Sequence, residues 1–395
     1  MPSTSTLTGT VLRPGDPGYD VERRGFQAAH AHRPDLVVAA RSAADVRAAV
    51  RHAAGHDLPL AVQSSGHGLA APLDGGLLIS TRHMRKVTVD PAARRAHAEA
   101  GATWGDVVAA AAPHGLAPLS GSSPGVGVVG YLLGGGFGLL GRTFGFAADR
   151  VRRVEGVTAA GDPVHLDGLP ARGDGTVVTA VETELVELAG IWGGSLALEV
   201  TPAVLDGWAA WSADLPEEVT TGISLVPFAD DPALPPPLRG RHVAMIAVAS
   251  TVDAEDLARP LRDLGPVLHE SLGRLPAVRS HTIHHDPTEP EPYVGDAHLL
   301  RSLDRQGLRS IPELTGPTAA VPSVVEVRRL GGAYSRGRTV PATFREAGYL
   351  LRAITVLDGP AEAAARALHR DLFRPFGSDV LGRAWTFAYG LARPN

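Results

Sequence analysis

Cysteine is absent from the 395-residue sequence, and lysine occurs only at Lys86. Without thiols the chain forms no disulfide, thiolate nucleophile, cysteine-ligated zinc site or iron–sulfur cluster. Long apolar runs are also missing, since none approaches the roughly eighteen residues that indicate a transmembrane helix. We therefore expect a globular protein that does not cross a membrane.

The sequence also lacks a segment in which charges of one sign are concentrated. The formal net charge is −5, so the chain offers no basic face to a phosphate backbone, and no nucleic-acid partner is expected. The first residues, MPSTSTLTGT, lack the basic and apolar segments of a secretory signal, which makes the cytoplasm the expected location. The composition is compatible with a homodimer.

The first half alternates short strands with helices. Apolar runs predict the strands, and apolar residues at helical spacing predict the helices, one of which is capped by Ser42 and ended by Gly55. The predicted strands are Leu36–Ala39, Leu58–Val62, Leu77–Ser80 and Arg95–Ala100, and the predicted helices are Ala43–Ala54 and Trp104–Ala112. This alternation indicates α+β or α/β layers.

Near Gly190 the pattern changes, and proline-rich breaks occupy residues 226–238 and 286–292. The predicted strands are here Ile191–Val200, His242–Val248 and Ser323–Arg328, and the predicted helices are Ala254–Leu264 and Ala361–Arg374. Because 395 residues exceed one ordinary core, we expect a second sheet-plus-helix domain that covers the first.

Glycine is concentrated in Gly121–Gly138, here called the glycine belt. Each glycine inside a regular element costs about 0.5–1 kcal/mol relative to alanine, so we expect extended backbone that approaches a ligand closely, with residues 134–136 turning the chain. The alternative, a mobile surface loop, fits poorly because it would expose several apolar side chains. Those side chains are Val126, Val128, Val129, Leu132 and Leu133.

The belt also contains a literal GxGxxG sequence at residues 125–130. A dinucleotide-binding Rossmann unit needs a strand before this motif and a helix after it. Turn-forming residues 118–124 precede the motif and three consecutive glycines follow it, so this interpretation is disfavoured.

A second motif, QSSGHG at Gln63–Gly68, follows a predicted strand. Successive amides of a Ser-Ser-Gly turn form an anion nest suited to a pyrophosphate, which would fix His67 beside the bound phosphate. The alternative is a turn with an incidental surface histidine, since the chain has 16 histidines. The glycine belt further along the chain favours the cofactor interpretation.

Four segments, in order, carry a resemblance to a known family. They read DLVVAARSAADVRAAVRHAAGHDLPLAVQSSGHG, GGLLIS, AEAGATWGDV and GSSPGVGVVGYLLGGGFGLLGRTFGFAADRV. Over residues 10–190 the chain resembles the FAD-binding domain of the vanillyl-alcohol-oxidase and berberine-bridge-enzyme family, which includes 6-hydroxynicotine-oxidase-like enzymes. SVVEVRRLGGAYSR, residues 323–336, looks like a strand of the family's substrate domain.

The resemblance implies an α+β fold with three parts. Residues 1–190 would form a PCMH-type FAD-binding domain, and residues 191–375 a substrate domain of antiparallel sheet covered by helices. Residues 376–395 would form a C-terminal segment that returns toward the FAD domain.

The resemblance also implies contacts to FAD. The family's R-S-G-G-H loop aligns with residues 63–67, so His67 is the candidate for an 8α-histidyl bond to the flavin. Ser123 stands where bicovalent members have cysteine, which implies one covalent bond at most. The implied FAD-contacting residues are Gln63, Ser64, Ser65, Gly66, His67, Gly68, Leu69, Gly121, Ser122, Ser123, Val126, Gly127, Val128, Gly130, Tyr131, Val177 and Val178.

The chain departs from the family pattern in three places. Gln63 replaces the usual arginine, and only HLDGLPARGDGT lies between Val164 and Val177, where the family has a longer stretch containing F-W-A-x-R-G-G. The family's C-terminal Y-x-N-[FY] pattern corresponds to Ala384–Tyr389, which has lost the asparagine, and its Y-D-P-x-N-x-F segment has no counterpart. These departures bear on catalysis more than on FAD binding.

The family's chemistry is hydride transfer from a small alcohol, amine or phenol of secondary metabolism to flavin N5, with molecular oxygen as acceptor. A tyrosine serves as the base only where a cation or hydrogen bond lowers its pKa from about 10. The candidates are Tyr131, Tyr334, Tyr349 and Tyr389, with Tyr131 first because it lies in the glycine belt; for each, simple packing is the alternative.

Two other functions stay open on the same scaffold. One is a cyclase or isomerase of natural-product biosynthesis without net oxidation, and the other is a non-catalytic flavin-binding homologue. No metal is expected, because His52 and His56 lie on an alanine-rich predicted helix and His284–Asp286 lies in a polar loop.

Overall fold

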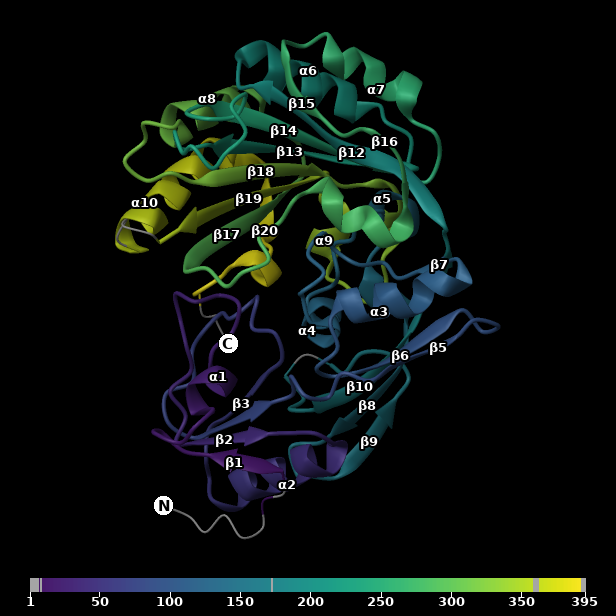
Figure 1. The fold of residues 1–395 in the computed structure, drawn as a ribbon, viewed down its shortest axis with the longest axis vertical. Helices are drawn as coiled ribbons and strands as arrows, with labels where there is room; N and C mark the ends of the chain where they lie inside the picture. Colours follow the sequence, from purple (N-terminus) through teal and green to yellow (C-terminus); the bar gives the residue numbers. More distant parts are fainter. Residues whose placement is uncertain (1–6, 8, 172, 358–361, 392–395) are drawn as a thin grey trace.

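The computed structural model describes residues 7, 9–171, 173–357 and 362–391. Among these residues, a four-stranded sheet, a five-stranded sheet and a two-stranded sheet form the first half, and a nine-stranded sheet forms most of the second half (Figure 1). The predicted α+β fold is confirmed. No helix among the described residues is both long and apolar enough to cross a membrane.

The first small sheet has the strand order β1-β2-β4-β3, and β4 pairs in parallel with both β2 and β3. Helix α2 (Ala43–Gly55) connects β2 to β3 and begins at Ser42, whose side chain accepts a hydrogen bond from Asp45 N. Val46 and Val50 of this helix pack against the sheet. The strands are β1 (Thr10–Leu12), β2 (Leu36–Ala39), β3 (Leu60–Gln63) and β4 (Leu77–Ser80), and α1 (Tyr19–Arg23) lies between β1 and β2.

The second small sheet is antiparallel with the order β5-β6-β10-β8-β9. Helix α3 (Trp104–Ala111) begins with a capping box between Thr103 and Asp106, and Trp104 packs into the core beneath the sheet. Such a cap contributes about 1 kcal/mol. The strands are β5 (Val87–Asp90), β6 (Arg95–Glu99), β8 (Val151–Val157), β9 (Pro163–Leu166) and β10 (Val177–Glu184), while β7 (Leu116–Ala117) pairs with β11 (Val186–Glu187).

The glycine belt differs from the expectation of extended backbone. Residues Val128–Leu133 form helix α4, in which Val128 and Leu132 are fully buried against the core of the second sheet. That burial outweighs the cost of the one glycine inside the helix, about 1 kcal/mol. The expected turn at residues 134–136 is present, with positive φ at Gly135 and Gly136, and α5 (Gly141–Phe144) follows.

The second half is built on an antiparallel sheet with the order β15-β12-β14-β13-β18-β19-β17-β20, in which β16 also pairs with β12. Helices α6, α7, α8 and α10 cover one face, and the first half of the chain lies against the other (Figure 1). The strands are β12 (Gly190–Glu199), β13 (Val219–Pro227), β14 (His242–Ser250), β15 (Val267–Glu270), β16 (Gly273–Pro276), β17 (Tyr293–Leu300), β18 (Val324–Arg329), β19 (Tyr349–Val356) and β20 (Val380–Arg383). The helices are α6 (Pro202–Ala213), α7 (Glu255–Arg262), α8 (Arg305–Thr315), α9 (Ala342–Glu346) and α10 (Glu362–Phe373).

The sequence-based element boundaries shift by a few residues in the structure. Ala361, the predicted first residue of the last helix, lies outside the described residues. A mixed aromatic core joins the two halves, because Phe137 and Phe146 of the first half pack with Tyr334 and Leu350 of the second. The domain boundaries at residues 190 and 375 stay predictions.

Candidate functional site

The site begins where two parallel strands end side by side. Gln63 ends β3 and pairs with Ser80, which ends β4. Carboxyl ends of parallel strands lie at the same edge of a sheet, so the loop after β3 and the loop after β4 are neighbours there. The first of these loops, residues 64–69, is called the His67 loop below.

The glycine belt meets the His67 loop across a narrow gap. Gly127 N donates a hydrogen bond to Ser65 Oγ at 3.1 Å. A Cβ atom at Gly127 would lie 3.1 Å from Ser64 Oγ, and one at Gly125 would lie 3.1 Å from His67 Nε2. The two motifs found in the sequence therefore lie together in space, and glycine allows their close approach.

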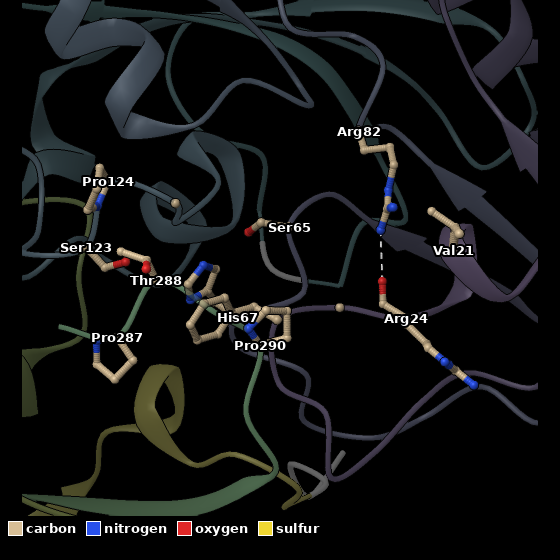
Figure 2. A pocket seen from close by; sticks show the side chains of 13 residues that line it. Val21, Arg24, Ser65, His67, Arg82, Ser123, Pro124, Pro287, Thr288 and Pro290 are labelled. Carbon is tan, nitrogen blue, oxygen red and sulfur yellow. Dashed lines mark hydrogen bonds between the residues drawn. The ribbon is translucent and has the colours of Figure 1, made fainter. Parts of the chain in front are cut away.

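Beside this gap lies a cavity of about 530 Å³, called the His67 cavity (Figure 2). Its lining comes from the N-terminal segment, the His67 loop, the loop after β4, the glycine belt and the proline-rich loop after residue 284. The lining residues are Val21, Arg24, Gly25, Phe26, Ser65, His67, Arg82, Ser123, Pro124, Gly125, Pro287, Thr288 and Pro290.

The His67 cavity is chemically suited to an anionic ligand. Two arginines line it, no lining residue is acidic, and Arg82 donates to the Arg24 carbonyl at 2.8 Å (Figure 2). Next to it, Ser64 Oγ is buried and makes no hydrogen bond to any described residue. The volume lies within the roughly 300–1,000 Å³ of small-molecule sites. Guanidinium and hydroxyl groups are donors that fit a pyrophosphate, so these residues fit FAD.

His67 is held from several sides. Its imidazole stacks on the Phe26 ring with the centroids 3.9 Å apart and the planes at 11°. Tyr293 Oη donates a hydrogen bond to the His67 carbonyl at 2.8 Å. Burial lowers the pKa of His67 to about 4, although Asp286 and a hydrogen bond to the Gly125 backbone oppose the shift. The ring is therefore neutral at pH 7 and keeps a free nitrogen lone pair.

The other expected FAD-contacting residues near His67 differ in how deeply they are buried. The Gln63 side chain is buried beneath the loop, where it donates to the Glu22 carbonyl at 3.5 Å rather than lining the cavity. Gly68 and Gly130 are exposed, and Leu69 accepts a hydrogen bond from Gly390 N at 3.0 Å. Ser122 is half-buried, and Val126 and Val128 join the belt to Trp104 and Ala102 through backbone hydrogen bonds.

Val177 and Val178 lie away from the His67 cavity, at the start of β10. Val177 packs into the core of the first small sheet and Val178 into the core of the second. They therefore lie at the junction of the two small sheets.

Gly121 and Gly136 serve a different purpose from the one expected of the belt. A Cβ atom at either position would meet the Tyr131 ring, at 3.2 Å and 2.8 Å respectively. These glycines make room for Tyr131, whose ring also packs edge-on against Trp104.

Three of the four candidate tyrosine bases, Tyr131, Tyr334 and Tyr389, have protonated phenols at neutral pH, and the fourth, Tyr349, packs its ring under the Arg329 guanidinium. Burial raises the pKa of Tyr131 well above its usual value and that of Tyr334 to about 12. Both donate to backbone carbonyls, Tyr131 to Leu119 at 3.3 Å and Tyr334 to Gly138 at 3.0 Å. Burial also raises the pKa of Tyr389, but Arg352 opposes that shift by its charge and a hydrogen bond.

Near these tyrosines lies a cluster of buried charges on the sheet face that is turned toward the first half. Glu326, only 2% exposed, accepts a hydrogen bond from Arg328 at 2.8 Å and pairs with Arg352 at 2.9 Å. Burial alone would raise the pKa of Glu326, but the two arginines hold it well below its usual range. We call these three residues the Glu326 cluster. No group of three or more metal-ligating side chains suited to an ion occurs among the described residues.

Several residues of the site were not found by sequence reasoning. Arg24, Phe26 and Tyr293 come from segments far from either motif, and their sequence neighbourhoods carry no signal. Arg82 could have been found, because it follows β4 by two residues at the edge where the His67 loop begins.

Comparison with known proteins finds a family match for the segment that carries the His67 loop and the glycine belt. Residues 34–167 match the family model described as an FAD binding domain. The chain is 37% identical over 195 residues to (R)-6-hydroxynicotine oxidase of Paenarthrobacter nicotinovorans, which covers 46% of this chain and 43% of the relative. The matched regions span less than half the length of the curated relatives.

Solved structures extend the likeness to the whole fold. The structure of 6-hydroxy-D-nicotine oxidase from Arthrobacter nicotinovorans superposes with a TM-score of 0.80 at 22% identity, covering 98% of this chain and 90% of that one. A berberine-bridge-enzyme-like protein of Physcomitrella patens gives a TM-score of 0.79 at 15% identity, covering 96% and 89%. The resemblance to the vanillyl-alcohol-oxidase and berberine-bridge-enzyme family is thus confirmed: residues 34–167 match an FAD binding domain, and the chain shares the fold of these solved structures.

Proposed function

We propose that this chain is an FAD-dependent oxidase that removes a hydride from a small alcohol, amine or phenol and uses molecular oxygen as the final acceptor. The observation that carries the proposal is the His67 cavity, where both cofactor motifs of an FAD-binding domain meet around donors suited to a pyrophosphate. A relative that is 37% identical in this region is named as an oxidase.

In this proposal the chain's own residues bind and orient the cofactor. Ser64, Ser65, Arg24 and Arg82 would hold the pyrophosphate, and backbone near Val177 would contact the adenine. Bound FAD supplies the hydride acceptor and passes two electrons to oxygen, which yields hydrogen peroxide. His67, neutral at pH 7, would form a single covalent bond to the flavin, and Ser123 adds none.

The base that takes the heteroatom proton would be Tyr389. Tyr131 and Tyr334 are each committed to a backbone carbonyl, whereas Tyr389 receives a hydrogen bond from Arg352. A guanidinium beside a phenol favours the phenolate and eases proton transfer.

A cyclase or isomerase that leaves the flavin oxidised is the second candidate. It is favoured by the raised pKa values of all three phenols, which keep them protonated at neutral pH. A protonated phenol can orient a substrate by a hydrogen bond and can donate a proton to it as a general acid.

An absorption spectrum tests FAD binding directly. We expect a yellow protein with a flavin band near 450 nm, whose flavin stays with the pellet after acid precipitation. His67→Ala should still bind FAD but release it into the supernatant, while the exposed His114→Ala should behave like the wild type. A colourless protein that takes up no added FAD would refute the proposal.

Substrate-dependent hydrogen peroxide then separates the two candidate activities. Peroxide formation with a panel of alcohols, amines and phenols would support the oxidase. Conversion of a substrate without oxygen, with the flavin band unchanged, would establish the redox-neutral activity instead.

A further inference from the structure

Phe26 has no role in the proposed function so far, yet it makes the closest ring contact to His67. The two rings are nearly parallel, with centroids 3.9 Å apart, and Phe26 lines the His67 cavity. Aromatic pairs at this distance prefer defined geometries and hold each other in place.

The backbone around Phe26 is itself fixed from two directions. Phe26 N donates to the Ser65 carbonyl at 2.9 Å, and Glu291 N donates to the Phe26 carbonyl at 3.1 Å. Gly25 packs directly on Gly66, because a Cβ atom at Gly25 would lie 2.6 Å from Gly66 Cα. The segment therefore ties the His67 loop to the second half of the chain, and the Phe26 ring has little freedom to move away.

We propose that Phe26 is a positioning residue for flavin attachment: its ring holds the His67 imidazole in the orientation from which a ring nitrogen bonds the 8α-methyl carbon of FAD. The inference rests on the proposed covalent bond of the preceding subsection. Phe26 takes no part in the bond-forming step itself. It acts only by holding the His67 ring.

The attachment step balances with oxygen as the oxidant. One carbon–nitrogen bond forms, the methyl group loses one proton and the imidazole loses its N–H proton. The two electrons left on the cofactor go to oxygen, which takes up both protons and becomes hydrogen peroxide. No base beyond solvent and no other oxidant is needed for this balance.

The test compares flavin attachment in Phe26→Leu, Phe26→Tyr and wild type. Each protein, as purified, is incubated in air with excess FAD, and samples are acid-precipitated over time. Pellet flavin measures the covalent fraction, and supernatant flavin at the start measures non-covalent occupancy. We expect attachment in Phe26→Leu to be roughly 2- to 12-fold slower, the range set by the strength of an aromatic pair. Phe26→Tyr should restore the rate.

A second phenylalanine–histidine stack in the same chain supplies the matched control. Phe373 stacks on His298 with centroids 4.2 Å apart and planes at 19°, and neither residue lines the His67 cavity. Phe373→Leu loses a comparable contact, and we expect its attachment rate to equal that of the wild type. A general loss of stability would instead slow both leucine variants.

The outcomes separate the inference from the function on which it rests. Wild-type protein that releases all its flavin on precipitation would overturn the covalent bond and this inference together, while leaving FAD binding intact. Covalent wild-type flavin with an unchanged rate in Phe26→Leu would overturn the role of Phe26 alone. Equal slowing in Phe26→Leu and Phe26→Tyr would also contradict a role for the aromatic ring.

Discussion

The His67 cavity and the Glu326 cluster are both polar and partly enclosed, yet they are organised in opposite ways. In the cavity the two arginines are paired only loosely, Arg82 with Glu22 at 3.5 Å and Arg24 with Asp20 at 3.9 Å, and a neighbouring serine hydroxyl has no partner among the described residues. In the cluster one carboxylate already engages both guanidinium groups. Donors with loose pairs or no partner can turn to a ligand, whereas the short pairs of the cluster indicate structure that is already in place when the ligand arrives.

The sharpest test of the closed region is Glu326→Gln. Removing this charge leaves Arg328 and Arg352 buried without compensation, which typically costs 3–5 kcal/mol. We expect a loss of about that size in the free energy of unfolding, measured with urea at pH 7. Glu199→Gln on the same sheet breaks an exposed pair with Arg241 and should cost less than about 1 kcal/mol. Equal losses of unfolding free energy in the two variants would contradict the view that the Glu326 cluster is a structural unit.

The open region depends on close backbone approach, which Gly66→Ala removes. Gly66 has φ of +69°, and its added Cβ would lie 2.4 Å from Gly25 Cα. A left-handed non-glycine residue costs about 1–3 kcal/mol, and the displaced loop should also lose FAD occupancy, read from the ratio of absorbance at 450 and 280 nm. Gly377→Ala, at an exposed position outside the loop with nothing within 4 Å of an added Cβ, is the control. Full occupancy in Gly66→Ala would show that the loop tolerates the shift.

The second half should also respond to acid through His369. Burial, and to a smaller degree Arg366, lowers the pKa of His369 to about 4. As the pH falls below about 6.5, His369 takes up a proton in the unfolded chain before it does so in the folded protein. The contribution of the neutral, buried His369 to the free energy of unfolding is therefore complete above about pH 6.5 and is lost toward pH 4. We expect the drop in unfolding free energy between pH 7.5 and 5 to be about 2 kcal/mol smaller in His369→Gln than in wild type. An unchanged drop would mean that other groups set the acid sensitivity.

Arg82→Gln should have the smallest effect; besides the ligand contact it removes the hydrogen bond to the Arg24 carbonyl and a 3.5 Å pair with Glu22. A charge-assisted hydrogen bond to a phosphate is worth about 1.5 kcal/mol, or roughly tenfold in affinity. The change is best made together with His67→Ala, so that FAD binds reversibly and its dissociation constant can be titrated by flavin fluorescence. Arg51→Gln, which breaks an exposed pair with Asp162, should leave the affinity unchanged. Identical affinities in all three backgrounds would exclude Arg82 from the binding site.

Sequence reasoning succeeded where local pattern and burial agree. The apolar runs Leu36–Ala39 and Leu77–Ser80 are strands with the predicted bounds, because both are buried along their whole length between turn residues. The meeting of the His67 loop with the glycine belt followed from the family resemblance. It could not have been derived from either motif alone.

Sequence reasoning failed where tertiary packing decides. Residues 128–133 are helical because two side chains at helical spacing reach a buried core, which glycine content does not reveal. Tyr131 stays the predicted first choice for a base; its ring fills space left by two glycines and its hydroxyl donates to a carbonyl, which the sequence does not reveal. Phe26 and Tyr293 reach His67 only after distant segments have folded together.

The hydrogen bond from Tyr293 to the His67 carbonyl joins residues 226 positions apart. At the usual rate of synthesis, about 5–20 residues per second, the ribosome needs roughly 10–45 s after making the histidine to reach its tyrosine partner. During synthesis, the His67 loop therefore exists for many seconds before the hydrogen bond from Tyr293 can form. Binding of the cofactor would follow translation of both halves. The N-terminal half produced alone would contain the same sequence motifs, but its His67 loop would lack the hydrogen bond from Tyr293.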